Sequence, residues 1–273
     1  MHKLVSRIIR NLSKPYLLPS KIVGKLQWFY AGLNYNESKY IDEQVERFSK
    51  LGLNYSDTQS ELDSFYLSNE DCKAEISSCH HNLFVALSKK YKFKRILEIG
   101  THSGVSAILL SSLFPEATIT TIDLPDNHPI FLNTYNRDPI QSVEFIKKRD
   151  ELLKGVKNVK FVKMNSLNLT FIDEKFDLIW VDGAHGYPVV GIDIINSLRL
   201  VNNSGFVVCD DVYKHVRKSD KMYCSTASYE TISELSDAKI VDYSLILKRT
   251  VAPWGHPIMR KYIAILRKNS NNS

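Results

Sequence analysis

The sequence has few cysteines, and none of them lies in a metal-binding pattern. Its 273 residues contain four, Cys72, Cys79, Cys209 and Cys224. No CxxC pair occurs, and no histidine lies at zinc-finger spacing. Cys209 lies inside an apolar run, which suits a small buried residue better than a disulfide. The cysteine usage therefore favours a reducing compartment, and we expect a cytoplasmic protein.

Long hydrophobic runs are also absent. No window approaches the roughly 18 consecutive apolar residues of a membrane span. The first 26 residues have scattered charges and no continuous apolar core, so they do not form a secretory signal peptide. They are basic and contain serine, so composition alone leaves a transit peptide open.

Acidic residues are missing from residues 1–36, which hold six basic ones: Lys3, Arg7, Arg10, Lys14, Lys21 and Lys25. The rest of the chain then has 30 basic and 30 acidic residues and is neutral. This balance argues against a nucleic-acid-binding surface on the main domain. We expect the basic segment to form a lid or an oligomer contact, with peripheral membrane attachment as the alternative, and we expect a homo-oligomer.

Beyond these absences, the chain alternates between strand and helix patterns. Strands are predicted at residues 95–99, 118–124, 159–164, 176–181, 205–209, 240–247 and 262–267, and helices at 36–50, 75–91, 104–113, 139–154, 189–200 and 228–236. The near-continuous apolar strands predict a mostly parallel sheet covered on both faces. The last two strands are close in sequence, which predicts an antiparallel pair.

The predicted fold is therefore α/β, with a doubly wound, Rossmann-like sheet of seven strands and an antiparallel last strand. We divide the chain into an N-terminal helical extension (1–74), a main domain (75–268) and a frayed polar tail (269–273).

The first predicted strand ends in a glycine-containing turn. It reads Glu98-Ile-Gly-Thr-His-Ser-Gly-Val-Ser106. Gly100 permits a sharp turn, and Gly104 lets a helix begin close to a ligand. His102 replaces the second glycine of GxGxxG, which disfavours a pyrophosphate-binding dinucleotide fold. Taken alone, the turn is also compatible with an ordinary strand-to-helix connection.

Acidic residues follow three other strands. Asp123 could accept hydrogen bonds from ribose hydroxyls, or simply close the loop before Pro125. Asp182, Asp210 and Asp211 follow the fourth and fifth strands, whose ends converge on one edge of the sheet. Three converging carboxylates would need a cation, and oxygen ligands favour Mg²⁺ or a similar divalent ion. The plainer alternative is that these residues cap the helices that follow.

His185 lies three residues after Asp182, in the segment VDGAHGY. Histidine titrates near neutrality, so His185 could remove a proton from a reacting group. It could equally orient the substrate or a metal ligand.

Together these motifs resemble class I S-adenosylmethionine-dependent methyltransferases over about residues 75–268. EIGTHSGVS is similar to the first motif of the metal-dependent O-methyltransferases of catechol and caffeoyl-CoA type, with Val105 in place of the usual Tyr. TIDL matches the ribose-binding acid at Asp123. VDGAHGY followed by GFVVCDD resembles the branch that contains macrocin-type sugar O-methyltransferases.

The resemblance implies roles for individual residues. S-adenosylmethionine would be bound by the first turn, the ribose acid, the residues after the third strand and the first metal carboxylate: Glu98, Gly100, Thr101, His102, Ser103, Gly104, Ser106, Asp123, Asn165, Ser166 and Asp182. Mg²⁺ would be held by Asp182, Asp210 and Asp211. His185 would be the general base, at the position of the Lys base of the catechol type. The acceptor would be a small molecule or a glycan, methylated on a hydroxyl.

Two other functions remain open. One is a metal-independent methyltransferase whose carboxylates are structural. The other is a non-catalytic subunit that keeps the cofactor pocket and assembles through its N-terminal region. A nicotinamide-dependent oxidoreductase is disfavoured by the missing GxGxxG. No Asn/Asp-Pro-Pro-Tyr motif occurs, which argues against methylation of nucleic-acid amino groups.

Overall fold

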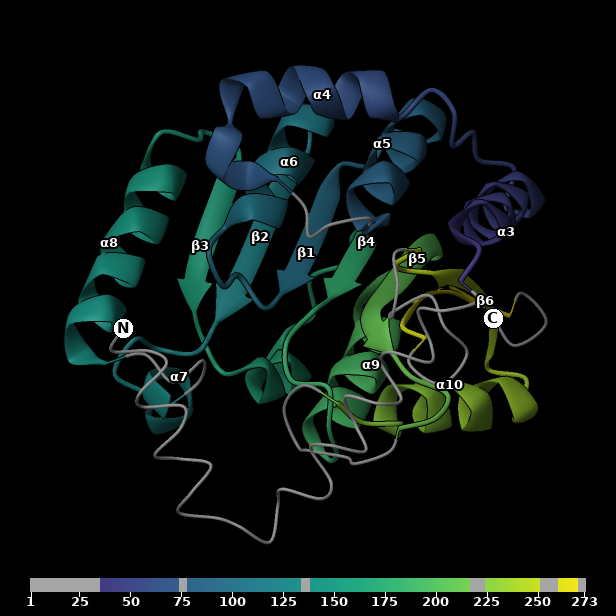
Figure 1. Ribbon diagram of the computed structural model, residues 1–273. Helices are drawn as coiled ribbons and strands as arrows, with labels where there is room; N and C mark the ends of the chain where they lie inside the picture. Colours follow the sequence, from purple (N-terminus) through teal and green to yellow (C-terminus); the bar gives the residue numbers. More distant parts are fainter. Residues whose placement is uncertain (1–34, 74–77, 134–137, 217–223, 251–259, 270–273) are drawn as a thin grey trace, which may run out of the picture.

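A seven-stranded sheet forms the centre of the computed structural model, which describes residues 35–73, 78–133, 138–216, 224–250 and 260–269. The strand order is β3-β2-β1-β4-β5-β7-β6 (Figure 1). The first five strands in this order are parallel, and β7 is antiparallel to both β5 and β6. The predicted fold class is confirmed. The strands are β1 (Arg95–Ile99), β2 (Thr118–Asp123), β3 (Val159–Lys163), β4 (Phe176–Val181), β5 (Val201–Val212), β6 (Val241–Leu247) and β7 (Tyr262–Lys268).

The helices agree with the predicted pattern where their sequence signals are strong. Helices predicted at 139–154 and 189–200 have those bounds, whereas the helix predicted at 75–91 begins only at His80. Two short helices, α4 and α7, have no counterpart among the predicted elements. The described helices are α3 (Glu37–Lys50), α4 (Gln59–Ser68), η2 (Glu70–Cys72), α5 (His80–Lys90), α6 (Val105–Leu113), α7 (Pro129–Asn133), α8 (Pro139–Lys154), η4 (Ser166–Phe171), α9 (Val189–Leu200) and α10 (Ala227–Asp237).

Helices cover both faces of the sheet. Successive residues of a strand point to opposite faces. Ile96 of β1 accordingly joins the core cluster formed with α5, α6 and α8, while Leu97 joins the cluster formed with α9 and α10. Both strand residues are at most 1% exposed. This two-sided burial explains why the strands read as continuous apolar runs.

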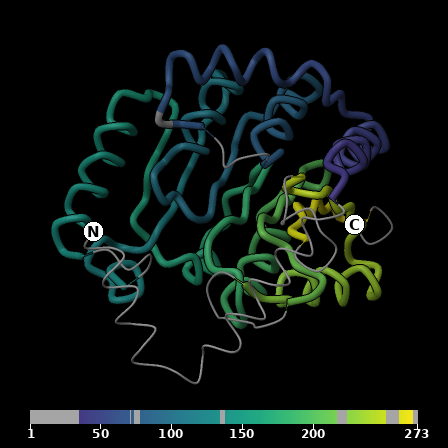
Figure 2. Tube along the Cα trace, in the orientation of Figure 1, coloured from purple at the N-terminus to yellow at the C-terminus, as the bar shows by residue number. Residues whose placement is uncertain are grey.

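The N-terminal helix α3 packs beside the C-terminal strands, as Figures 1 and 2 show. Its Gln44 side chain is buried and donates a hydrogen bond to the Leu247 carbonyl at 2.7 Å. Its Glu43 forms an ion pair of 3.0 Å with Arg260. Phe48 belongs to the core cluster that includes Ile96. Helix α3 of the predicted extension thus packs on the sheet, and the boundary at residue 74 stays a prediction.

Several predicted features lie outside the described residues. These are the basic segment up to residue 34, the loop around residues 253–257 and residues 270–273 of the tail. In the part of the chain that is described, no helix has the length and apolar character needed to cross a membrane.

His81 gives the fold a pH dependence. It is 1% exposed, and its Nδ1 lies 2.7 Å from the hydroxyl of Tyr66. Burial lowers the pKa of His81 to about 2. In the unfolded chain this residue takes up a proton as the pH falls through about 6.5. The free energy of unfolding should therefore fall below pH 6.5, by about 1 kcal/mol per pH unit from this residue.

Urea denaturation at pH 7.5 and pH 5.0 measures this effect. We expect His81→Asn to lose less stability between the two pH values than the wild type. The matched control is His215→Asn, because His215 is exposed. An equal loss in the wild type and His81→Asn would contradict the prediction.

Candidate functional site

The candidate site lies where the parallel strands end. In the sheet register, Ile99 of β1 pairs with Ile122 of β2 and with Val181 of β4, and Val181 pairs with Cys209 of β5. Asp123 comes directly after Ile122, Gly100 after Ile99, Asp182 after Val181 and Asp210 after Cys209. The register therefore brings four of the predicted site residues to one edge of the sheet.

The two glycines of the first turn are required by the backbone. Gly100 has a φ of +105°, and a Cβ at this residue would lie 2.2 Å from the carbonyl oxygen of Asp182. Gly104 has a φ of +84°, and its Cβ would lie 2.9 Å from Leu153 Cδ2. Any L side chain would be strained in these conformations. The turn from β1 into α6 thus passes close to the loop after β4.

Two threonine hydroxyls and one carboxyl group form a buried hydrogen-bonded chain beneath this turn, on its interior side. The Thr121 hydroxyl donates to Glu98 Oε2 at 2.5 Å and lies 2.6 Å from the Thr101 hydroxyl. All three side chains are buried. Burial raises the pKa of Glu98 to about 8, although the hydrogen bond from Thr121 opposes the shift. Glu98 is therefore largely protonated at neutral pH and anchors the turn from within the protein.

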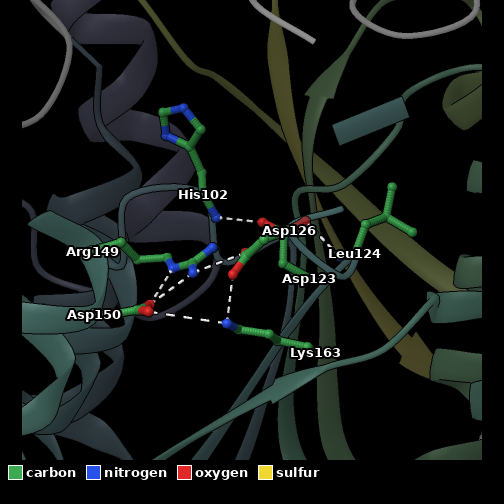
Figure 3. Close-up of polar contacts among 7 residues, drawn as sticks. All are labelled: His102, Asp123, Leu124, Asp126, Arg149, Asp150 and Lys163. Carbon is green, nitrogen blue, oxygen red and sulfur yellow. Dashed lines mark hydrogen bonds and ion pairs between the residues drawn. The ribbon is translucent and has the colours of Figure 1, made fainter. Parts of the chain in front are cut away.

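Asp123 joins the turn to the end of β2. Its Oδ2 accepts a hydrogen bond from the backbone N–H of His102 at 2.9 Å, and its Oδ1 accepts one from the N–H of Leu124 at 2.7 Å (Figure 3). Burial raises the pKa of Asp123, whereas these N–H groups and the charge of Arg149 lower it. The imidazole of His102 is exposed and lies 4.9 Å from the ring of Phe145.

A buried arginine, Arg149, lies to one side of Asp123 and contacts Asp126 and Asp150 (Figure 3). The guanidinium of Arg149 pairs with Asp126 at 3.0 Å and with Asp150 at 2.7 Å, and it lies 4.5 Å from the ring of Phe161. Lys163 also pairs with Asp126. Sequence reasoning did not identify this network. A charged residue in the amphipathic pattern of 139–154 resembles an ordinary surface arginine.

The remaining predicted cofactor residues lie around this turn. Ser103 lies within it and Ser106 in the first turn of α6, and both are half-buried. Asn165 follows β3 and accepts a hydrogen bond from the N–H of Leu167 at 3.0 Å, so it caps η4. The backbone N–H of Met164 donates to the Asp123 carbonyl at 2.7 Å, which ties the end of β3 to the end of β2.

Asp193 is a second residue that sequence reasoning missed. It lies on the buried face of α9 and is 0% exposed. Burial raises the pKa of its carboxyl to about 6, and neither carboxylate oxygen accepts a hydrogen bond from the described residues. A Cβ on Gly183 would be 3.8 Å from Asp193 Oδ2. Asp193 thus lies between the loop after β4 and the residues predicted at the adenine. The sequence signal that could have identified Asp193 is the presence of an acidic residue inside the apolar helix pattern of residues 189–200.

His185 is buried next to the acidic strand ends. It is 7% exposed, and its Nε2 lies 3.8 Å from Asp182 Oδ1, which is beyond hydrogen-bond distance. Burial lowers the pKa of His185, against the opposing effect of Asp211 and Asp210. The imidazole is therefore neutral at neutral pH and is able to accept a proton.

Asp210 and Asp211 are paired with two lysines. Lys248 Nζ lies 2.5 Å from Asp210 Oδ2 and 2.8 Å from Asp211 Oδ1, and Lys261 Nζ lies 2.6 Å from Asp211 Oδ2. Asp211 has a φ of 49°, an uncommon value for a residue other than glycine. The two ammonium groups hold the pKa of Asp211 below its usual range. The predicted convergence of carboxylates is present, but the cations among them are ammonium groups.

This arrangement does not fit a divalent metal. Mg²⁺ requires about six oxygen ligands at about 2.1 Å. Three of the four carboxylate oxygens of Asp210 and Asp211 are instead taken by lysine ammonium groups. Within the described ranges, no three His, Cys, Asp or Glu side chains are arranged to hold a metal ion.

Comparison with known proteins agrees with this geometry. Residues 97–212, less than half of the chain, match the profile of a family described as a methyltransferase domain. The match begins in β1 and ends at the last residue of β5. It therefore includes the Gly100 turn, Asp123, Asp182 and the acidic pair.

A fatty-acid O-methyltransferase from Mycolicibacterium smegmatis is 27% identical over 119 residues, which are 43% of this chain and 37% of that protein. The chain thus spans little more than a third of this relative. The O-methyltransferase TomG from Streptomyces achromogenes, solved with S-adenosylmethionine, has a TM-score of 0.51 and 18% identity, with 86% of this chain and 99% of that chain covered. A methyltransferase from Podospora anserina, solved with S-adenosylhomocysteine, has a TM-score of 0.51 and 20% identity, covering 78% and 88%.

Residues 97–212 match a methyltransferase-domain family, and the fold around them is shared with solved structures of methyltransferases. Both findings agree with the resemblance that the sequence motifs indicate. The roles of the individual residues stay predictions.

The close approach at Gly100 is testable by adding one methyl group. Gly100→Ala places a Cβ against the Asp182 carbonyl at a left-handed φ, so we expect a loss of more than about 2 kcal/mol in the free energy of unfolding. The control is Gly155→Ala, because nothing lies within 4 Å of a Cβ there. Urea denaturation compares the two, and equal stability of both variants would contradict the packing described.

Proposed function

We propose that this protein transfers the methyl group of S-adenosylmethionine to a hydroxyl oxygen of a small-molecule or glycan acceptor. The observation that carries the proposal is the Gly100 turn, where Asp123 accepts the backbone N–H of His102 at the carboxyl edge of the sheet. A turn of this kind presents further N–H groups to a bound anion. It lies inside the region that matches the methyltransferase family.

In this proposal the cofactor is held by residues from three strand ends. The turn from Gly100 to Gly104 holds the methionine end, with Ser106 beside it and Glu98 beneath. Asp123 binds the ribose, since a carboxylate that accepts two N–H bonds still has lone pairs for hydroxyl groups. Asn165 and Ser166 lie at the adenine, and Asp193 supports them from α9. When bound, the cofactor supplies a methyl group on a positively charged sulfur.

His185 acts as the general base. Its Nε2 would take the proton of the acceptor hydroxyl, and the cofactor, when bound, would supply the methyl group to that oxygen and leave as a neutral thioether. Lowering the pKa by burial keeps the imidazole in the form that accepts this proton. The buried surroundings exclude water and strengthen the electrostatic interactions of the site.

An oxygen acceptor is supported by the relatives. The protein from Mycolicibacterium smegmatis is named a fatty-acid O-methyltransferase, and TomG is named an O-methyltransferase. The proposal contains no metal step, because lysine ammonium groups accompany the carboxylates. We further propose that the basic N-terminal segment forms a lid or a contact between copies of the chain, with membrane contact as the alternative.

Titration with S-adenosylhomocysteine tests cofactor binding. We expect the wild type to bind and Asp123→Ala to bind at least about tenfold more weakly, because it removes the ribose acid and frees the N–H of His102. Asp173→Ala is the control, since Asp173 is fully exposed on another loop. Absence of binding by the folded wild type in calorimetry would overturn the proposed function.

His185→Ala tests the base. We expect kcat to fall by about 10²-fold while the affinity for S-adenosylhomocysteine is unchanged. The readout is release of S-adenosylhomocysteine, measured with an acceptor selected from sugars and phenols. A change confined to KM would instead make His185 a substrate-binding residue.

A further inference from the structure

We infer that Lys248 is the resident cation of the cluster formed by Asp182, Asp210 and Asp211, and that its ammonium group replaces the divalent metal which such a cluster would otherwise need. The inference rests on the proposed function and deepens it, because it makes methyl transfer by this site independent of metal. Lys248 is a positioning residue here, since it acts by fixing the carboxylates beside His185.

The ion pairs have the geometry of strong, charge-assisted hydrogen bonds. Lys248 Nζ lies 2.5 Å from Asp210 and 2.8 Å from Asp211. The Lys248 side chain is 5% exposed, and that of Asp210 is 4% exposed. Hydrogen bonds between ionised partners are shorter and stronger than those between neutral groups. Asp182 also interacts electrostatically with Lys248.

The sheet topology delivers the lysines to this edge. β6 is antiparallel to β7, which is antiparallel to β5, so β6 runs in the same direction as the parallel strands. Lys248 comes directly after β6, and Lys261 directly before β7. Both lysines therefore reach the edge where β4 and β5 place their acids.

The backbone holds Lys248 in place. Its N–H donates to the carbonyl of Lys261 at 2.9 Å, and its carbonyl accepts the N–H of Cys79 at 2.9 Å. The side chain of Gln44 also reaches this strand end, at the carbonyl of Leu247. Lys248 would have to leave a buried ion pair to admit another cation, and its ammonium group would then lose its carboxylate partners, which is strongly destabilising for a buried charge.

The oxygens that remain are too few for a metal. Asp211 uses both carboxylate oxygens for lysines, and Asp210 uses one. Asp210 Oδ1 is buried and accepts no hydrogen bond from the described residues. A divalent ion bound through this oxygen would lie next to the ammonium group of Lys248 and be repelled by it. Lys248 and Lys261 together thus balance the charges of Asp210 and Asp211, and Lys248 excludes a metal from the cluster.

Binding of Mn²⁺, measured by electron paramagnetic resonance on the chelator-treated full chain, tests the inference without any acceptor. We expect the wild type to bind no Mn²⁺ at 1:1 stoichiometry at about 100 µM, which is within the range of carboxylate sites for hard cations. We expect Lys248→Ala to bind one Mn²⁺ and to gain thermal stability from it, because removal of the ammonium group frees Asp210 Oδ2 and Asp211 Oδ1 while Lys261 stays on Asp211 Oδ2.

Two further variants sharpen the result. Lys268→Ala removes a lysine of β7 that donates to the Val201 carbonyl, so it should bind no Mn²⁺. Asp210→Asn combined with Lys248→Ala should abolish the gained binding. A merely structural role of Lys248 would give a destabilised variant that Mn²⁺ does not stabilise.

Tight 1:1 binding of Mn²⁺ to the wild type would overturn the inference, and so would a folded Lys248→Ala variant that binds none. If that variant does not fold, the binding of Mn²⁺ by the wild type still tests the inference. Titration of the same wild-type sample with S-adenosylhomocysteine tests the proposed function separately. Failure of the Mn²⁺ prediction therefore leaves the proposed cofactor binding untouched, and the reverse also holds.

Discussion

The buried ion pair between Lys248 and Asp210 is the interaction on which the acidic edge of the sheet depends. Asp210 ends the apolar part of β5, where a lone carboxylate would be strongly disfavoured by burial. Pairing with an ammonium group at 2.5 Å makes this position tolerable. The strand that supplies the lysine belongs to the antiparallel end of the sheet. The antiparallel end of the sheet therefore also places lysines at the acidic edge.

On the other side of the site, the determining constraint is the close approach of two backbones. The carbonyl of Asp182 occupies the space that a side chain at residue 100 would need. The turn is supported from the interior by the hydrogen-bonded side chains of Glu98, Thr121 and Thr101. Asp123 accepts the backbone N–H of His102 and so holds the turn from the end of β2. The proposed cofactor-binding surface would thus consist of backbone groups whose positions are set by buried contacts, which favours preorganisation. His185 and the carboxylate cluster lie across from it, beyond Asp182.

Much of the fold could be predicted because local signals agreed with it. Helix α8 begins at its predicted residue since Asp138 and Gln141 form a capping box around Pro139. The buried strands read as apolar runs, as expected for a sheet covered on both faces. Helix α4 was missed because its polar and apolar residues show little amphipathic pattern, and β5 is longer than predicted because Asn202, Asn203 and Ser204 are poor strand signals.

The site was predictable in its placement but not in its electrostatics. Strand ends and the spacing of Asp182, Asp210 and Asp211 correctly placed the acids together. The cation could not be read from the sequence, because Lys248 is 38 residues from Asp210 and resembles any lysine that closes an apolar strand. Arg149 and Asp193 were missed for the same reason, since their burial depends on packing between distant segments. Charges that are paired over long sequence separations need the tertiary structure to be recognised.

A crystal structure grown with S-adenosylhomocysteine and Mn²⁺, with anomalous data collected at the manganese edge, would locate the cofactor product and any bound metal in one experiment. We expect the cofactor product along the Gly100 turn, the ammonium group of Lys248 between Asp210 and Asp211, and no anomalous peak among the three carboxylates. A manganese peak ligated by Asp182, Asp210 and Asp211, with Lys248 displaced, would contradict this expectation.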